Sequence, residues 1–133
     1  MKGQKGFTLI ELIIVIAIIA ILAAVAIPNY LGFRDRANIS AAKESLGALR
    51  TALEVYRADH NNYPSASDAG TLESTLTASN PIPYFSTSDW DKLEANIAGW
   101  KTVNVQADTY TIEVTAKDRG GTTITATPGG ISP

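Results

Sequence analysis

The chain has 133 residues, no cysteine, one histidine and a formal net charge of −2. This length fits one small domain and excludes a large multidomain enzyme. The lack of cysteine removes disulfides, thiolate nucleophiles and cysteine-based zinc sites. Acidic side chains outnumber basic ones, 13 to 11, and no two basic residues are adjacent. We therefore infer no nucleic acid binding.

The first element is an apolar segment, residues 7–27, in which only Thr8 and Glu11 are polar. As a helix it would span about 30 Å, the thickness of the hydrocarbon core of a bilayer. Lys2 and Lys5 precede it, and the positive-inside tendency places this end in the cytoplasm. The sequence thus predicts a single membrane-spanning helix with an extracytoplasmic remainder.

Two other interpretations of this segment stay open: a secretory signal peptide and a plain membrane anchor. A short basic start, an apolar stretch and the small residues around Val25 are also the ingredients of a signal peptide. However, the uninterrupted apolar run is slightly longer than usual for one, and Glu11 has no role there.

After Pro28 the pattern becomes amphipathic and predicts that the helix continues to about His60. Pro28 and Gly32 weaken it, so we expect a bend or local melting there. Arg50 and Glu54 stand four residues apart and can pair. Apolar residues step by three or four along one stripe, as a helix packed on a core requires: Ile39, Ala42, Leu46, Leu49, Leu53 and Tyr56.

The C-terminal half predicts a connecting loop over 63–99, with short helices near 68–76 and 89–98, and then a small sheet within 100–133. Alternating β-rich runs indicate antiparallel strands at 100–105, 109–117 and 122–127, the last two joined by a hairpin at 118–121. The predicted fold class is α+β, with one long helix packed against this antiparallel sheet.

The most informative motif is Lys5-Gly6-Phe7-Thr8-Leu9-Ile10-Glu11, followed by the apolar run that ends at Ala26-Ile27-Pro28. This ordered combination resembles the prepilin N-terminus of type IV pilins and of the pseudopilins of type II secretion. The resemblance covers roughly the first third of the chain.

The resemblance implies a pilin-like fold and a maturation pathway. Residues 1–6 would be a leader that a prepilin peptidase removes after Gly6, and the same enzyme would N-methylate the new terminus at Phe7. Residues 7–28 would be the transmembrane and filament-core helix, and 29–62 its amphipathic second half. The subunits would assemble into a helical homo-oligomer on an inner-membrane platform with a cytoplasmic ATPase, without catalysis or a cofactor.

Glu11 and Pro28 are the candidate assembly residues. A carboxylate in an apolar membrane helix costs about 2.5 to 3.5 kcal/mol at mid-bilayer, so it needs a cationic partner unless it reaches the headgroups. The resemblance implies the N-terminal amine of a neighbouring subunit, although the amine of its own chain is also possible. Pro28 either marks the end of the membrane segment or lets residues 26–32 melt during assembly.

Other polar groups suggest no catalytic or metal site. Asp59 and His60 lack the partners of a catalytic set. An acidic group near Trp90, Asp89, Asp91 and Glu94, raises the question of calcium, but it has no EF-hand loop pattern. Asp89 is instead the expected N-cap of a short helix. Asn38 begins a glycosylation acceptor pattern, but inside a predicted helix.

The main prediction is therefore a type IV pilus subunit, anchored in the inner membrane and then assembled into an extracellular filament for adhesion, twitching or DNA uptake. The alternative is a type II secretion pseudopilin, which forms a periplasmic pseudopilus. Trp90 and Trp100 lack the Pro-Trp-Gly-like surroundings that major pseudopilins usually have, which favours the pilus. A third hypothesis is a monomeric, membrane-anchored binding domain.

Overall fold

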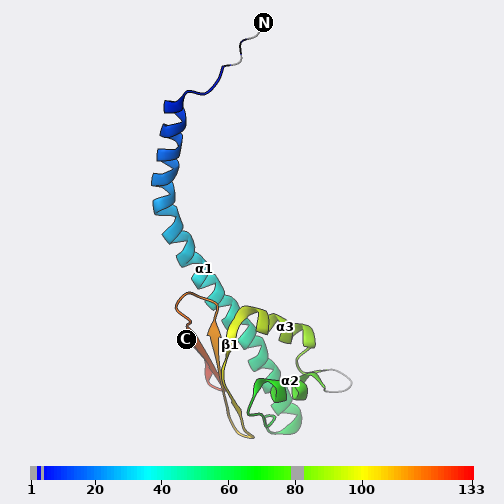
Figure 1. The fold of residues 1–133 in the computed structure, drawn as a ribbon. Helices are drawn as coiled ribbons and strands as arrows, with labels where there is room; N and C mark the ends of the chain where they lie inside the picture. The colour runs from blue at the N-terminus through cyan, green and yellow to red at the C-terminus, as the bar shows by residue number, and fades with distance from the viewer. Residues whose placement is uncertain (1–2, 4, 79–82) are drawn as a thin grey trace. The chain divides into compact units, whose positions relative to one another are not determined.

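The computed structural model describes residues 3, 5–78 and 83–133, so Lys2 lies outside the described residues. The contacts divide the chain into an N-terminal unit, Met1–Arg34, and a C-terminal unit, Asp35–Pro133. Helix α1 belongs to both units. The elements follow in chain order (Figure 1): α1 Leu9–His60, α2 Ala69–Thr77, α3 Thr87–Asn96, β1 Ile97–Val105, β2 Tyr110–Ala116, β3 Thr123–Thr127 and β4 Gly130–Ser132.

The predicted α+β class, with a long N-terminal helix and an antiparallel sheet, is confirmed. The four strands pair with their sequence neighbours in the order β1-β2-β3-β4, and Ile112 is the partner of both Val103 and Ala126. The sheet begins at Ile97, three residues before the expected first strand. Strand β4 was not expected, because three residues that begin with a glycine carry no alternating pattern.

The core of the C-terminal unit joins α1 to the buried face of the sheet. The predicted stripe on α1 is confirmed, since its central leucines are fully buried and Ile39 and Tyr56 pack at its margin. Alternate residues of β2 supply the opposing face, because successive side chains of a strand point to opposite sides. These β2 residues are Tyr110, Ile112, Val114 and Ala116.

Helix α1 remains helical through Pro28 and Gly32, so the structure does not show the local melting expected there. A proline removes only one backbone hydrogen bond of the helix. Because α1 has 52 residues, intact helical turns lie on both sides of Pro28. The expected end near His60 is confirmed. Asn61 adopts a left-handed φ of 60°, and a ring nitrogen of His60 lies 3.1 Å from the carbonyl oxygen of Tyr56.

Arg50 and Glu54, whose spacing allows a pair within α1, bond to tertiary partners instead. Arg50 donates to the carbonyl oxygens of Thr127 and Pro128, at 3.1 and 2.7 Å, which fixes the β3–β4 turn against α1. Glu54 accepts a hydrogen bond of 2.9 Å from the Tyr63 hydroxyl. Half-buried polar groups prefer such geometrically fixed partners to an exposed pair within one helix.

Candidate processing and assembly site

Gly6 and Phe7 precede α1 and belong to no helix or strand. The Phe7 side chain is 92% exposed. A Cβ atom placed on Gly6 would meet nothing within 4 Å, so the chain itself does not require glycine at this position. The backbone on both sides of the Gly6–Phe7 bond is therefore open to another protein.

Glu11 lies in the first turn of α1, where it forms a capping box with Thr8. Its Oε2 atom accepts from the Thr8 backbone N–H at 2.8 Å and from the Thr8 hydroxyl at 2.7 Å. In return, the Glu11 N–H donates to the Thr8 hydroxyl oxygen at 3.3 Å. This motif satisfies amides that the start of a helix leaves free, and a negative charge is favourable there.

This local role of Glu11 was not among the expectations from the sequence, although the sequence carries its signal. A threonine followed three residues later by a glutamate, before an apolar run, is the sequence signature of a capping box. Glu11 thus has partners in the single chain and does not depend on an intermolecular cation to be satisfied.

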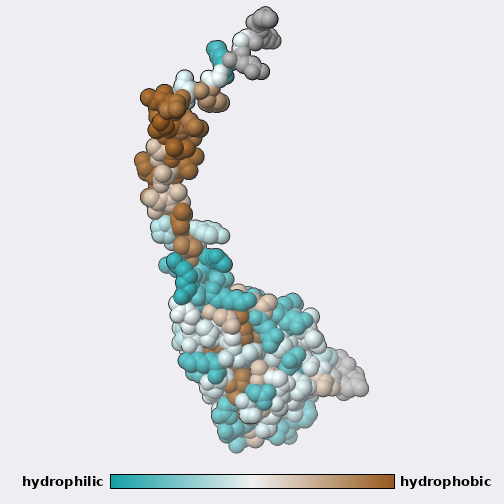
Figure 2. Space-filling model, in the orientation of Figure 1, coloured by the Kyte–Doolittle hydropathy of each residue, from teal (hydrophilic) through white to brown (hydrophobic). Residues whose placement is uncertain are grey.

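The part of α1 that follows Glu11 exposes apolar side chains through successive turns, and hydrophobic residues dominate the face of it that Figure 2 shows. The stretch is long and apolar enough to cross a membrane. An apolar surface of this kind is normally covered by lipid or by other protein chains. Its large exposed side chains include Leu12, Ile13, Ile14, Val15, Ile16, Ile18, Ile19, Ile21, Leu22, Val25 and Ile27.

The structure does not bring the two candidate assembly residues together. Glu11 lies at the start of the apolar stretch and Pro28 follows its end, 17 residues later, which is about 26 Å along a helix. Pro28 is exposed, and the neighbouring Asn29 amide donates to the Val25 carbonyl oxygen at 3.2 Å. Whatever each residue does in assembly, they act at separate places.

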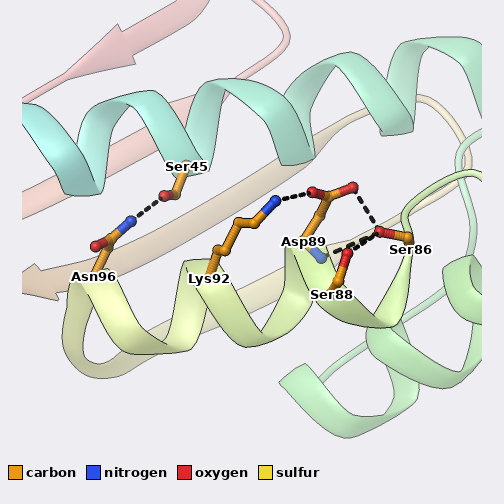
Figure 3. A network of polar contacts seen from close by, with 6 residues as sticks. All are labelled: Ser45, Ser86, Ser88, Asp89, Lys92 and Asn96. Atoms are coloured by element: carbon orange, nitrogen blue, oxygen red, sulfur yellow. Dashed lines mark hydrogen bonds and ion pairs between the residues drawn. The ribbon is translucent and has the colours of Figure 1, made fainter.

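Among the acidic residues near Trp90, Asp89 bonds to Ser86 and Lys92 within helix α3 (Figure 3). Asp89 is not the N-cap as expected, because Ser86 occupies that position and accepts from the Asp89 N–H. The Ser86 hydroxyl, together with the ammonium of Lys92, lowers the pKa of Asp89. The described residues contain no cluster of three or more side chains suited to hold a metal ion.

The pair Asp59 and His60 forms a polar helix end without catalytic geometry. Asp59 accepts a hydrogen bond of 2.8 Å from the Tyr84 hydroxyl. The ring of His60 stacks on that of Tyr56 with 4.1 Å between centroids. Neither contact places an activated nucleophile beside the histidine.

The β2–β3 hairpin is held against α1 close to the point where the C-terminal unit begins. The Arg119 guanidinium pairs with Asp35 at 2.8 Å, and the Asn38 amide nitrogen donates to the Lys117 carbonyl oxygen at 2.9 Å. Asn38, the residue of the glycosylation pattern, therefore uses its amide within the fold. Contacts across about 80 residues of sequence leave no local signal, so the sequence could not predict them.

Two family models match consecutive parts of the chain. Residues 1–27 match the prokaryotic N-terminal methylation motif. Residues 29–92 match the protein G family of the type II secretion system. Together the matches run from residue 1 into α3, and the sheet lies beyond both of them.

The chain is also similar to several curated proteins. It is 40% identical over 84 residues to type II secretion system core protein G of Vibrio cholerae, an alignment that covers 62% of the chain and 56% of the relative. For core protein G of Escherichia coli the identity is 39% over 75 residues, with coverages of 56% and 50%. A fimbrial protein of Pseudomonas aeruginosa is 46% identical over 83 residues, with coverages of 57% and 54%. The chain thus spans about half the length of these relatives.

Proposed function

We propose that this chain is the major pseudopilin of a type II secretion system. It belongs to the superfamily of pilins and type II secretion pseudopilins, whose members are structural, non-enzymatic proteins. The match of residues 29–92 to the protein G family carries this proposal. The methylation motif is common to pilins and pseudopilins, whereas the protein G match extends over the part that follows it. The comparisons thus favour the alternative of the sequence analysis over its main prediction.

Maturation would begin at the exposed segment before α1. A prepilin peptidase cuts the bond between Gly6 and Phe7 on the cytoplasmic side of the inner membrane and methylates the new amine. The lack of helix or strand at these residues supports this step, because a protease needs an extended, accessible backbone. The apolar stretch of α1 holds the subunit in the membrane until assembly.

Assembly would transfer the apolar stretch from lipid to contacts with other copies. Glu11 then exchanges its bonds to Thr8 for the methylated amine of a neighbouring Phe7, since methylation preserves the positive charge. The pair is favourable because two charges in an apolar filament core attract strongly, whereas either one alone would be costly. Pro28, at the other end of the stretch, is where α1 would unwind to adjust its length.

The proposed location is the inner membrane, followed by a periplasmic pseudopilus rather than an extracellular fibre. The partners are the prepilin peptidase, further copies of the chain, and an inner-membrane assembly platform driven by a cytoplasmic ATPase. The protein G match and the membrane-type helix support this set of partners.

A type IV pilus subunit is the second candidate function. The similarity to the fimbrial protein of Pseudomonas aeruginosa favours it, because that identity of 46% exceeds the 40% shared with core protein G of Vibrio cholerae. The two functions share maturation and the helical core, so only the cellular role separates them.

Deletion of the gene in its host, with secreted proteins and surface filaments measured in parallel, tests the proposal. We expect export of secreted enzymes to stop while twitching and surface pili continue, and the intact gene to restore export. A gene that carries Gly3→Val, a change outside the proposed cleavage site, should also restore export. Normal export with loss of surface pili would contradict the proposal and support the second candidate.

A further inference from the structure

Two exposed aromatic rings and an exposed guanidinium follow the apolar stretch of α1. Tyr30 is 67% exposed, Phe33 is 68% exposed, and Arg34 is exposed as well. Residues three and four apart on a helix lie on the same side, so the three side chains form one face of the N-terminal unit, here called the juxtamembrane face. Aromatic rings and arginine are enriched at binding surfaces, so this composition indicates an interaction site.

The Arg34 guanidinium is free to bind an anion. It makes no hydrogen bond or ion pair with the residues that the structure describes. The only carboxylate within one helical turn of it is Asp35, which is half-buried and already paired with Arg119 at 2.8 Å. Glu44, the next carboxylate on α1, lies about 15 Å farther along the helix, beyond the screening length of about 8 Å. Arg36 is a second exposed cation, so this stretch of α1 carries positive charge.

The position of the juxtamembrane face along α1 matches the edge of a bilayer. Residues 9–27 of α1 span about 29 Å, close to the thickness of the hydrocarbon core, and the headgroups add about 5 to 8 Å on each side. Tyr30 and Phe33 follow Ile27 by about 4.5 and 9 Å, at the level where aromatic rings are favoured. Helical side chains lean toward the N-terminus, which here is the direction of the bilayer, so the long Arg34 side chain reaches back to the headgroups.

We propose that the juxtamembrane face binds phospholipid headgroups on the extracytoplasmic side of the membrane. The rings of Tyr30 and Phe33 lie at the interface, and the planar Arg34 guanidinium matches the oxygens of a lipid phosphate. The proposal rests on the membrane stage of the proposed function and adds the lipid partner and the residues that bind it. These contacts hold α1 at one depth before assembly and break when the subunit leaves the bilayer.

Electron paramagnetic resonance of the full chain in vesicles tests this contact. The chain has no cysteine, so Ala37→Cys places a single spin label at an exposed position about one turn beyond Arg34. The measured quantity is the collision rate of the label with a water-soluble nickel complex, which is low among headgroups and high in water. One set of vesicles contains phosphatidylethanolamine and phosphatidylglycerol. A second set contains digalactosyl diacylglycerol, which has no phosphate.

In phospholipid vesicles, Phe33→Ala and Arg34→Gln should each raise the collision rate about two- to fivefold, because the face loses a contact that holds it at the interface. Lys101→Gln removes an exposed cation from β1 and is the matched control, with an unchanged rate. In phosphate-free vesicles the chain without these substitutions should already show the higher rate, and Arg34→Gln should add nothing. Unchanged rates for both variants in phospholipid, or the same effect of Arg34→Gln in both vesicles, would overturn the proposal.

A different occupant of the juxtamembrane face would give a different pattern. If Phe33→Ala and Arg34→Gln lower only the assembled fraction in the host and leave the collision rate unchanged, the face contacts another copy of the chain and the lipid proposal is wrong. A label at Ala20→Cys, inside the apolar stretch, separates this failure from that of the proposed function. It should be shielded from the nickel complex, whereas a water-accessible label there would overturn the membrane stage itself and the lipid contact with it.

Discussion

The two units of the chain differ in whether their apolar residues are buried. In the N-terminal unit, large apolar side chains from Phe7 to Phe33 are exposed. In the C-terminal unit, α1 turns one apolar stripe toward a shared core and its described residues leave no buried side-chain polar atom without a partner. The C-terminal unit thus buries its apolar residues within itself, whereas the exposed apolar surface of the N-terminal unit is of the kind that lipid or another protein chain covers.

The largest effect that we predict is a loss of processing in the N-terminal unit that leaves the C-terminal unit unchanged. Gly6→Val should abolish cleavage, because the peptidase has to accommodate the residue before the cut, and should leave the C-terminal unit intact. Mass spectrometry of the membrane fraction would then find a chain six residues longer than the mature one. Gly3→Val, in the same leader, is the control and should be processed. Normal processing of Gly6→Val would remove the prepilin interpretation.

The second prediction concerns the assembly of the N-terminal unit. Glu11→Ala should leave cleavage intact and strongly reduce the assembled fraction, because the neighbouring amine loses its counter-charge. Thr8→Val removes the hydroxyl of the capping box but keeps the carboxylate, so we expect a milder loss. Equal losses in the two variants, measured as sedimentable protein, would mean that Glu11 serves only as a helix cap.

The third prediction concerns the core of the C-terminal unit. Leu53 is fully buried, so Leu53→Ala should lower the free energy of unfolding by about 2 to 5 kcal/mol. Val55, two residues later on α1, is 48% exposed, and Val55→Ala is the control with a much smaller loss. Denaturant unfolding of the detergent-solubilised chain measures both. Similar values for the two variants would contradict the buried stripe.

The smallest effect is a pH dependence confined to the C-terminal unit. Hydrogen bonds from Thr71 hold the pKa of Asp68 below its usual value, and bonds from Thr122 do the same for Asp118. A carboxyl group whose pKa is lower in the folded than in the unfolded chain stabilises the folded state at pH values above its pKa in the unfolded chain, which is near 3.8 for aspartate. Stability should therefore fall as the pH drops below about 4. Asp68→Asn should weaken this dependence, and an unchanged acid limb would contradict the account.

The sequence predicted the periodic features and missed those that depend on tertiary contact. The stripe on α1 was predicted because burial on one side imposes a helical period on Leu46, Leu49 and Leu53. The N-cap of α3 was placed at Asp89 rather than Ser86, since both residues are good caps and only the local geometry selects one. The partners of Arg50 come from a turn about 77 residues away, which no local pattern encodes.

For the candidate site too, a sequence motif identified the residues, whereas a few isolated residues did not identify the cellular role. Gly6, Phe7 and Glu11 were selected from an ordered motif, because processing and charge pairing depend on residue types at fixed spacing. The choice between pilus and pseudopilus relied on the sequence neighbours of two residues, Trp90 in α3 and Trp100 in β1, whereas the discriminating similarity extends over residues 29–92. Expectations from a few C-terminal residues thus carried less information than the whole amphipathic half of α1 with α2 and α3.

The most direct test of the central claim is mass spectrometry of the mature chain in two fractions, sheared surface filaments and the cell envelope. We expect a chain that begins at N-methylated Phe7, present in the envelope and absent from the long sheared fibres. The same methylated chain as the main component of surface fibres would contradict the pseudopilin proposal. An uncut chain beginning at Met1 would contradict maturation itself.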